Sequence, residues 1–432
     1  MLHPFDVNEK GHLSIGGIDA IDLANKYGTP LFVYDVERIR QHARAFVETF
    51  KKHDVNAQVA YASKAFSSIA MVQVAKQENL SLDVVSQGEL YTALKADFPV
   101  DKIHLHGNNK SLEELEMAVK HQIGCIVIDN FYEIELLQSI LEEYNTTMDV
   151  LIRVTPGIEA HTHDYILTGH DDSKFGFNLT NGQAEKALLN LISIDSIHVK
   201  GLHCHIGSQI FETDGFMMAV QRLFETLSTW RDQYQFVASV LNLGGGFGIR
   251  YTDEDEPLPL EKYVEALIDE ITIQTEKYGM DFPEIWIEPG RSIVGDAGLT
   301  LYSVGSVKEI PDVRKYVSVD GGMTDNLRPA LYQAKYDAVL ANKMNSSLDE
   351  TVSVAGKCCE SGDMLIWDIA LPKINSNDIL AVFSTGAYGY SMSNHYNRFP
   401  KAAVVFVENG IDKLVIERET YQDVIQNDRS YE

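Results

Sequence analysis

A lysine directly follows a short apolar run in the segment Tyr61-Ala62-Ser63-Lys64-Ala65. If the run is a buried strand, Lys64 lies at its carboxyl end, where an ammonium group needs a partner or its pKa falls. A lysine with a lowered pKa is a nucleophile toward carbonyl groups, among them the aldehyde of pyridoxal phosphate. The alternative for this segment alone is a lysine that extends past a strand end into solvent.

Three consecutive glycines begin the segment Gly244-Gly245-Gly246-Phe247-Gly248, which also follows an apolar run. Because glycine has no side chain, its backbone N–H groups can approach an anion, so the run is a candidate phosphate loop. The Gly-x-Gly-x-x-Gly spacing of dinucleotide-binding folds is absent, which leaves a tight structural turn as the main alternative.

Glu288 and His205 have side chains that suit an aromatic cofactor. A carboxylate such as Glu288 can keep a pyridine nitrogen protonated, although a salt bridge to Arg291 is the alternative. His205 is a flat partner for a flat ring, a hydrogen-bonded histidine at a strand end, or half of a metal pair with His203. The sequence supplies no third ligand at a useful spacing, so we expect no metal site. Further polar side chains follow other apolar runs, namely Asp83, His106 and Arg153.

The later part of the chain holds a thiol and a guanidinium that could act on a substrate. Cys359 lies between Cys358 and Glu360, and a thiol beside an acid is a candidate proton donor, whereas a buried, inert thiol is the alternative. Arg328 could grip a carboxylate by two parallel hydrogen bonds, or it could form a surface ion pair.

Short apolar runs alternate with helical patterns between about residues 55 and 290. Most runs are continuously apolar, as in strands of a parallel sheet that is covered on both faces. The expected strands are Gln58–Ser63, Leu82–Val85, Ile103–His106, Cys125–Asp129, Val150–Thr155, Val199–His205, Val240–Leu243 and Ile285–Glu288. Strands separated in this way by helices favour a (β/α)8 barrel over an open sheet. Function in such barrels gathers at the carboxyl ends of the strands, where Lys64, His205 and Glu288 stand.

The pattern changes after about residue 298, where short β-rich runs follow one another with few helical patterns. These runs are Thr300–Val307, Tyr316–Val319, Thr351–Ala355, Met364–Ile369, Ile379–Ser384, Ala402–Val407 and Lys413–Glu417. We therefore expect an N-terminal segment 1–30 that can pack with the C-terminal domain, a barrel domain 31–297, and a C-terminal β-domain 298–432 of the sandwich or barrel type.

The charge and cysteine content of the chain limit the binding partners and the compartment that we expect for the protein. With 36 Lys and Arg against 63 Asp and Glu, the net charge is −27, which argues against nucleic acids and anionic membranes because both attract basic surfaces. The four cysteines lack zinc spacing and suit a reducing cytosol. The first residues lack a signal-peptide pattern, and no apolar run approaches the ~20 residues of a membrane span. We expect a cytoplasmic protein with a small-molecule substrate.

Six motifs occur in the order found in the alanine-racemase-fold (fold type III) pyridoxal-phosphate decarboxylases. They are Tyr-Ala-x-Lys-Ala, His-x-His-Ile-Gly-Ser-Gln, Gly-Gly-Gly-Phe-Gly, Glu-Pro-Gly-Arg, Cys-Glu-Ser-Gly-Asp and Gly-Ala-Tyr. Each motif alone is weak, but six in order between residues 61 and 390 are highly specific. The chain resembles this group and, within it, the diaminopimelate decarboxylase family. It departs from the common pattern at Phe66, at Cys358 and in the segment 393–400.

The resemblance implies a barrel that carries pyridoxal 5'-phosphate, a C-terminal β-domain, and a head-to-tail homodimer with shared active sites. The implied cofactor-binding residues are Lys64 as the Schiff-base lysine, His205 against the ring, Glu288 at the pyridine nitrogen, and Ser208, Gly245, Gly246, Pro289, Gly290, Arg291 and Tyr388. The implied substrate-binding residues are Arg291, Arg328, Tyr332, Glu360 and Tyr388. Cys359 is implied as the catalytic proton donor, contributed by the other subunit.

The implied reaction is decarboxylation of meso-2,6-diaminopimelate to L-lysine and CO2, the last step of lysine biosynthesis. Arg328 and Glu360 would bind the second carboxylate and amine of that substrate. One alternative is another basic amino-acid decarboxylase of the same fold, acting on ornithine, lysine or arginine. A racemase is a second alternative, but such racemases place an arginine where Glu288 stands. The remaining alternatives are a non-catalytic cofactor-binding homologue and a metal-dependent barrel hydrolase built on His203 and His205.

Overall fold

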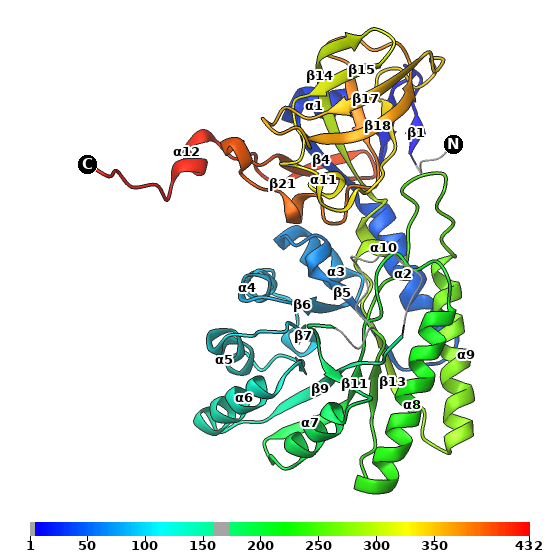
Figure 1. Cartoon of the computed structure of the whole chain (residues 1–432), viewed down its shortest axis with the longest axis vertical. Helices are drawn as coiled ribbons and strands as arrows, with labels where there is room; N and C mark the ends of the chain where they lie inside the picture. Colours follow the sequence, from blue (N-terminus) through cyan, green and yellow to red (C-terminus); the bar gives the residue numbers. More distant parts are fainter. Residues whose placement is uncertain (1–4, 159–172) are drawn as a thin grey trace. The chain divides into compact units, whose positions relative to one another are not determined.

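The computed structural model describes residues 5–158 and 173–432. Residues 1–4, which belong to the expected N-terminal segment and to the stretch without a signal-peptide pattern, lie outside the described residues. The chain divides into two compact units (Figure 1). The barrel unit comprises Gln41–Gly248 and Pro257–Ser292, and the β-rich unit comprises Met1–Arg40, Ile249–Glu256 and Ile293–Glu432.

The barrel unit contains the expected closed ring of parallel strands. Its strands are β5 (Ala57–Ala62), β6 (Ser81–Val84), β7 (Ile103–Leu105), β8 (Cys125–Ile128), β9 (Met148–Thr155), β11 (Ile197–His203), β12 (Val240–Asn242) and β13 (Glu284–Ile287). Each strand pairs in parallel with the next, and β13 pairs with β5 to close the ring. A short strand, β10 (Phe177–Asn178), also pairs with β9. The prediction of a (β/α)8 barrel is confirmed.

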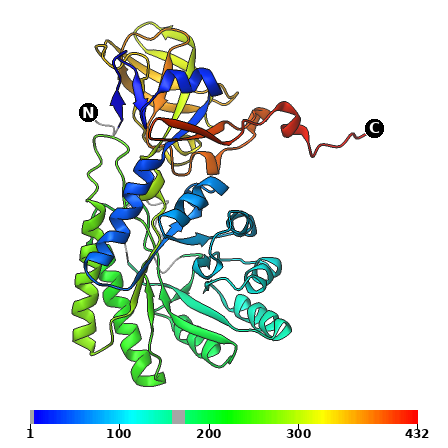
Figure 2. The same cartoon turned by 180° about the vertical axis from the view of Figure 1, so that it is seen from behind.

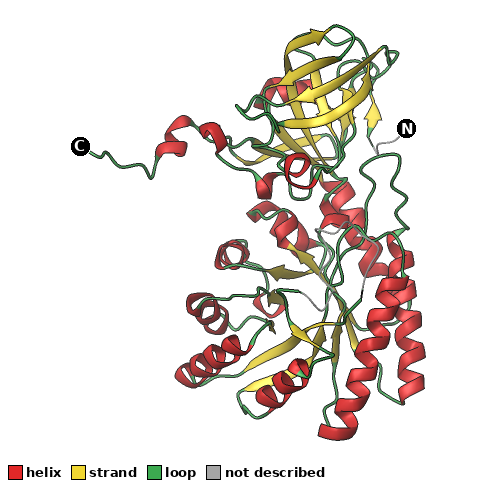
Figure 3. Cartoon of the chain, in the orientation of Figure 1, coloured by secondary structure: helices red, strands yellow, loops and turns green. Residues whose placement is uncertain are grey.

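Helices surround this ring, as Figure 3 shows for the described residues. They are α3 (Ile69–Gln77), α4 (Gln87–Lys95), α5 (Leu112–Lys120), α6 (Phe131–Tyr144), α7 (Gln183–Ile192), α8 (Asp214–Tyr234), α9 (Leu260–Tyr278) and the later part of α2 (Val36–Lys52). Figure 2 shows α8 and α9 side by side, as in the opposite view. Several helices begin at polar caps, and Ser111 and Glu114 form a complete capping box at the start of α5, which fixes where the loop after β7 ends.

A buried ion pair joins the loop after β7 to helix α6, which follows β8. The Lys110 ammonium lies 2.7 Å from Oε1 of Glu133, and both side chains are 1% exposed. Lys110 also donates to the carbonyl oxygens of Gly107 and Val127. Because every donor of a buried ammonium needs a partner, this pair holds the loop after β7 in one position against α6.

Glu133→Leu should therefore lower the free energy of unfolding by about 3 kcal/mol, because it leaves the Lys110 charge buried without its carboxylate. Urea denaturation of the variant measures this loss. In the double variant Lys110→Met/Glu133→Leu both charges are gone, so most of the stability should return. A single variant as stable as the parent protein would show that the pair does not contribute.

The β-rich unit is built on a second sheet with the strand order β18-β17-β15-β14-β4-β20-β21. Its strands are β4 (Leu31–Asp35), β14 (Gly298–Ile310), β15 (Arg314–Val319), β17 (Glu350–Ala355), β18 (Met364–Leu371), β20 (Ala403–Glu408) and β21 (Ile411–Ile416). Two further strands, β16 (Ala338–Leu340) and β19 (Ile379–Val382), pair with each other, and β19 also pairs with β14. All seven expected runs form strands, and β16 was not predicted.

The N-terminal residues belong to this β-rich unit. Strands β1 (Asp6–Val7), β2 (Leu13–Ile15) and β3 (Ile18–Asp19) precede helix α1 (Ala20–Tyr27), which Asp19 caps. Leu13 lies in the same apolar core as Leu31 and Leu299. The sequence places the start of the barrel domain at residue 31, whereas β4 pairs with β14 and β20. A continuous apolar run suits any strand that is buried on both faces, so composition alone does not assign β4 to a sheet.

Short helices complete the β-rich unit. Two of them are α11 (Arg328–Tyr332) and α12 (Tyr421–Ile425). In the part of the chain that the structure describes, no helix has the length and apolar character needed to cross a membrane.

Candidate active site

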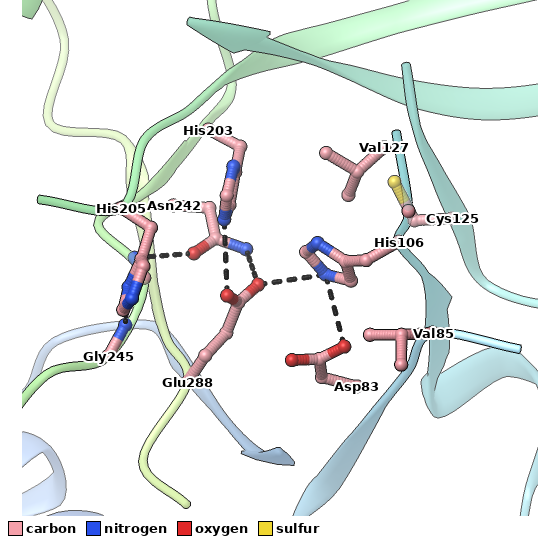
Figure 4. Close-up of polar contacts among 12 residues, drawn as sticks. Asp83, Val85, His106, Cys125, Val127, His203, His205, Asn242, Gly245 and Glu288 are labelled. Carbon is pink, nitrogen blue, oxygen red and sulfur yellow. Dashed lines mark hydrogen bonds and ion pairs between the residues drawn. The ribbon is translucent and has the colours of Figure 1, made fainter. Parts of the chain in front are cut away.

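The carboxyl ends of four barrel strands bring polar side chains around one buried carboxylate, Glu288, which directly follows β13 (Figure 4). Nδ2 of Asn242, the last residue of β12, donates to its Oε1 at 2.7 Å. Nε2 of His106, just after β7, lies 3.0 Å from the same oxygen. Nε2 of His203, the last residue of β11, lies 3.1 Å from Oε2. The carboxylate is therefore held at both oxygens.

Charge keeps this buried carboxylate ionised. Burial alone would raise the pKa of Glu288, but the charge of His106 and the hydrogen bonds of both histidines outweigh burial and hold that pKa well below its usual range. His106 also lies 3.7 Å from Oδ1 of Asp83. Burial works against its protonation, but Asp83 and Glu288 together raise the pKa of His106. Burial lowers the pKa of His203 to about 4. The pKa of His106 is thus raised and that of His203 is lowered, so His203 is the neutral, donating imidazole beside Glu288.

His205 and the glycine run face each other beside this cluster. Nδ1 of His205 accepts a hydrogen bond from Gly245 N at 3.2 Å. Burial, together with the charges of Lys64 and Arg153, lowers the pKa of His205 well below its usual value. The ring is therefore neutral, with its proton on Nε2. From the sequence, the Gly245 N–H was a candidate donor to an anion. In the structure it donates to the imidazole of His205.

The glycine run accepts no side chain. Gly244 and Gly246 have φ angles of +67° and +114°, which favour glycine. A Cβ on Gly245 would lie 2.1 Å from the carbonyl oxygen of Glu288. The tight approach links the loop after β12 to the residue after β13, so the backbone itself forms this wall of the site.

Lys64 lies in a short 3-10 turn, Ser63–Ala65, directly after β5, and its side chain is exposed. This differs from the buried position that its place after an apolar run suggested. The backbone beside it is fixed, because Ala62 N donates to Pro289 O at 3.1 Å and Gly290 packs against Ala62. Lys64 therefore presents its amine from a rigid turn.

Two further expected residues of the barrel unit contact each other. Arg291 begins the short helix α10 (Arg291–Val294), and its Nη2 donates to Ser208 Oγ at 2.9 Å. Arg291 is buried, whereas Ser208 is half-buried. This contact ties the loop after β11 to the loop after β13.

The β-rich unit holds the other expected residues. The Arg328 guanidinium lies over the rings of Tyr332 and Tyr388, each 5.5 Å away. Tyr388 has a φ angle of +60°, a left-handed conformation that is costly for a tyrosine and that the surrounding structure must hold. Cys359 and Glu360 are exposed in the loop after β17.

A buried aspartate shapes the loop that carries Cys359. Asp363 accepts hydrogen bonds from Met323 N at 2.6 Å and from Cys358 N at 2.8 Å. Cys358 is buried while Cys359 is exposed. Of the two adjacent thiols, Cys359 is therefore the one that a substrate can reach.

The sequence missed the residues that hold Glu288. Asp83 and His106 were recognised only as polar strand ends, and Asn242 was not singled out. An Asn as the last residue of an apolar strand, directly before a glycine run, is the signal that could have identified it. His106, His203 and Glu288 are residue types that can bind a metal, and their ligand atoms lie within 4.8 Å of one another. This group does not include His205, so it leaves the interpretation of the His203–His205 pair unchanged. Its members come from distant strands, and no spacing in the sequence marks them.

Comparison with known proteins identifies the class. The model of the pyridoxal-binding domain of pyridoxal-dependent decarboxylases matches residues 36–295, which is more than half of the chain. A diaminopimelate decarboxylase from Bacillus methanolicus is 66% identical over 95% of this chain and 95% of its own length. One from Bacillus subtilis (strain 168) is 63% identical over 98% and 96%.

A solved structure of the diaminopimelate decarboxylase from M. jannaschii in co-complex with L-lysine is 34% identical, with a TM-score of 0.93. The match covers 99% of this chain and 98% of that one. The site and fold thus define a pyridoxal-dependent decarboxylase. Within that class, the chain belongs to the diaminopimelate decarboxylase family.

The residues of the barrel site fit a pyridoxal group chemically. A pyridine nitrogen that stays protonated needs an ionised carboxylate beside it. His106, His203 and Asn242 maintain such a carboxylate at Glu288. Each Glu288 oxygen has two lone-pair positions, and Oε2 uses one for His203, so this oxygen can accept a further hydrogen bond. In the glycine run, the N–H groups of Gly244 and Gly245 already donate to Asn242 Oδ1 and His205 Nδ1. The run therefore favours an anionic group through its lack of side chains and not through these two donors.

Proposed function

We propose that the protein binds pyridoxal 5'-phosphate and removes CO2 from one end of meso-2,6-diaminopimelate, releasing L-lysine as in the last step of lysine biosynthesis. The observation that carries the proposal is the buried, ionised Glu288 at the carboxyl end of a barrel that has decarboxylase relatives. We propose a cytoplasmic location, because the small number of cysteines suits a reducing compartment.

When bound, pyridoxal phosphate supplies a protonated ring that accepts the electron pair left by departing CO2. Glu288 would hold the proton on the ring nitrogen, and His205 would pack against the ring. Lys64 would hold the aldehyde carbon through its amine. The remaining cofactor contacts are assigned to Ser208, Gly245, Gly246, Pro289, Gly290, Arg291 and Tyr388.

The substrate contacts follow from its two ends, each of which carries an amine and a carboxylate. The remote end carries a carboxylate and an amine, which require a cation and an acid, and Arg328 and Glu360 have those charges. Tyr332, Tyr388 and Arg291 would complete the pocket. Cys359 would donate its thiol proton to the carbon that has lost CO2. We further propose a head-to-tail homodimer in which Cys359 of one copy serves the site of the other.

Arg328→Ala should lower kcat/KM for meso-diaminopimelate by about 100-fold, since a two-point charged contact contributes roughly 2–3 kcal/mol. The loss should be confined to substrates with a remote carboxylate. Steady-state kinetics on the purified holoenzyme measures it. Unchanged kcat/KM would remove Arg328 from the substrate site.

The test of the proposed function is CO2 release from meso-diaminopimelate, L-lysine, L-ornithine and L-arginine with added cofactor. We expect release from diaminopimelate only. Preference for ornithine, arginine or lysine would instead identify another basic amino-acid decarboxylase. Cofactor binding without release from any of the four would identify a non-catalytic homologue.

A further inference from the structure

The Arg328 guanidinium lies in a box of four tyrosine side chains within the β-rich unit. Its central carbon is 5.5 Å from the ring centroids of Tyr332 and Tyr388 and 5.9 Å from that of Tyr251. Its Nε donates to the hydroxyl oxygen of Tyr336 at 3.0 Å. Aromatic faces at these distances attract a guanidinium without using its N–H groups, whereas Tyr336 uses one of them.

Tyr336 is anchored in the apolar core. Its side chain is 4% exposed and packs in one cluster with Tyr251. The two rings meet edge to face, 5.3 Å apart at 87°. Because the packed core holds the Tyr336 ring in place, its hydroxyl oxygen is an acceptor at a fixed position for the Nε of Arg328.

A guanidinium can grip a carboxylate in two-point fashion at either of two edges. The side edge uses Nε and one Nη, and the end edge uses both Nη atoms. In residues 5–158 and 173–432, the hydrogen bond to Tyr336 is the only one in which the Arg328 guanidinium takes part. This hydrogen bond occupies the side edge of the guanidinium. The end edge, with both Nη atoms, can then face a ligand.

We propose that Tyr336 is a positioning residue that restricts Arg328 to an end-on grip, through both Nη atoms, on the carboxylate at the unreacting end of the substrate. This inference rests on the proposed function and deepens it. It makes Tyr336 a determinant of specificity for substrates and products that carry a remote carboxylate, without contact between Tyr336 and the substrate.

The chemistry of the product supplies a selective probe. Loss of one CO2 from diaminopimelate leaves the other carboxylate in place, so L-lysine retains the group that Arg328 would bind. Cadaverine has the same carbon chain and amines but no carboxylate. The ratio of their inhibition constants therefore reports the contacts of that carboxylate, of which the contact with Arg328 is the one proposed.

The test is Tyr336→Phe in the holoenzyme, with Tyr251→Phe as the matched control that also loses one phenol hydroxyl beside Arg328. In Tyr336→Phe we expect the inhibition constant of L-lysine and the KM for meso-diaminopimelate to rise about tenfold. The kcat and the inhibition constant of cadaverine should change less than twofold. In Tyr251→Phe, whose ring contact remains, all four values should stay within twofold. Equal weakening of cadaverine and L-lysine, or no weakening of either, would overturn the inference.

Arg328→Lys separates this inference from the proposed function. If Arg328→Lys weakens L-lysine and Tyr336→Phe does not, the role of Tyr336 is wrong while the substrate site stands. If neither variant weakens L-lysine, Arg328 does not bind the remote carboxylate and the proposed function loses its substrate assignment. A crystal structure of the parent holoenzyme with L-lysine gives a second measurement that needs no variant. Both Nη atoms should contact the carboxylate, and a grip through Nε would contradict the inference.

Discussion

Lys64→Ala should abolish CO2 release from meso-diaminopimelate, with kcat reduced by at least about 10,000-fold, because no other amine is proposed to hold the cofactor aldehyde. The protein-bound cofactor should also lose the absorbance that its link to a lysine gives. Stopped assays of CO2 and an absorbance scan of the same preparation measure both effects.

The fold predicts that this loss is chemical and not structural. Lys64 is exposed in a short turn whose neighbours Ala62 and Gly290 hold the backbone. Removal of an exposed side chain of this kind changes stability by only about 0.5 kcal/mol. Lys120→Ala, at the exposed last position of α5, is the matched control and should leave kcat unchanged. A Lys64→Ala variant that turns over at the parent rate would refute the assignment.

Glu288→Gln should lower kcat by about 1,000-fold, because a neutral amide of the same shape cannot keep the pyridine nitrogen protonated. The substitution also removes one of the two carboxylates that raise the pKa of His106. That pKa should fall in the variant, and the imidazole signals of His106 in an NMR titration would report it in the protein without cofactor.

Glu284→Gln is the control for this variant, since Glu284 begins the same strand, β13, and is only half-buried. It should retain both kcat and the His106 titration. If Glu288→Gln retained the parent kcat, the ring nitrogen would not depend on this carboxylate. If the His106 pKa did not move, the observed 3.0 Å contact would not carry the charge coupling inferred from it.

The barrel could be predicted because its strands carry their own signature. Runs such as Cys125–Ile128 are apolar at every position, and the structure buries every one of those side chains, as a sheet covered on both faces requires. Strand β4, Leu31–Asp35, has the same signature but lies in the other sheet. Strand membership depends on pairing partners far along the chain, which a local pattern does not contain.

The candidate site could be predicted to the same extent as the barrel: single residues were found, but the contacts between them were not. Glu288 and His205 were located because barrel chemistry gathers where strands end. Their partners were not, since Asn242 and His106 reach Glu288 from positions 46 and 182 residues earlier in the chain. Likewise, nothing in the local sequence marks Tyr336 as the acceptor for Arg328. Pairwise contacts of this kind follow from the closed ring and the core, not from spacing.

The central claim is that Lys64, in the turn after β5, holds pyridoxal phosphate. Borohydride reduction of the cofactor-loaded protein makes the lysine–cofactor link permanent, and mass spectrometry of the peptides then locates it. The account predicts one pyridoxyl-phosphate group, on Lys64, and none in a parallel sample of Lys64→Ala. Modification of a different lysine in the parent protein, or no modification at all, would contradict the account.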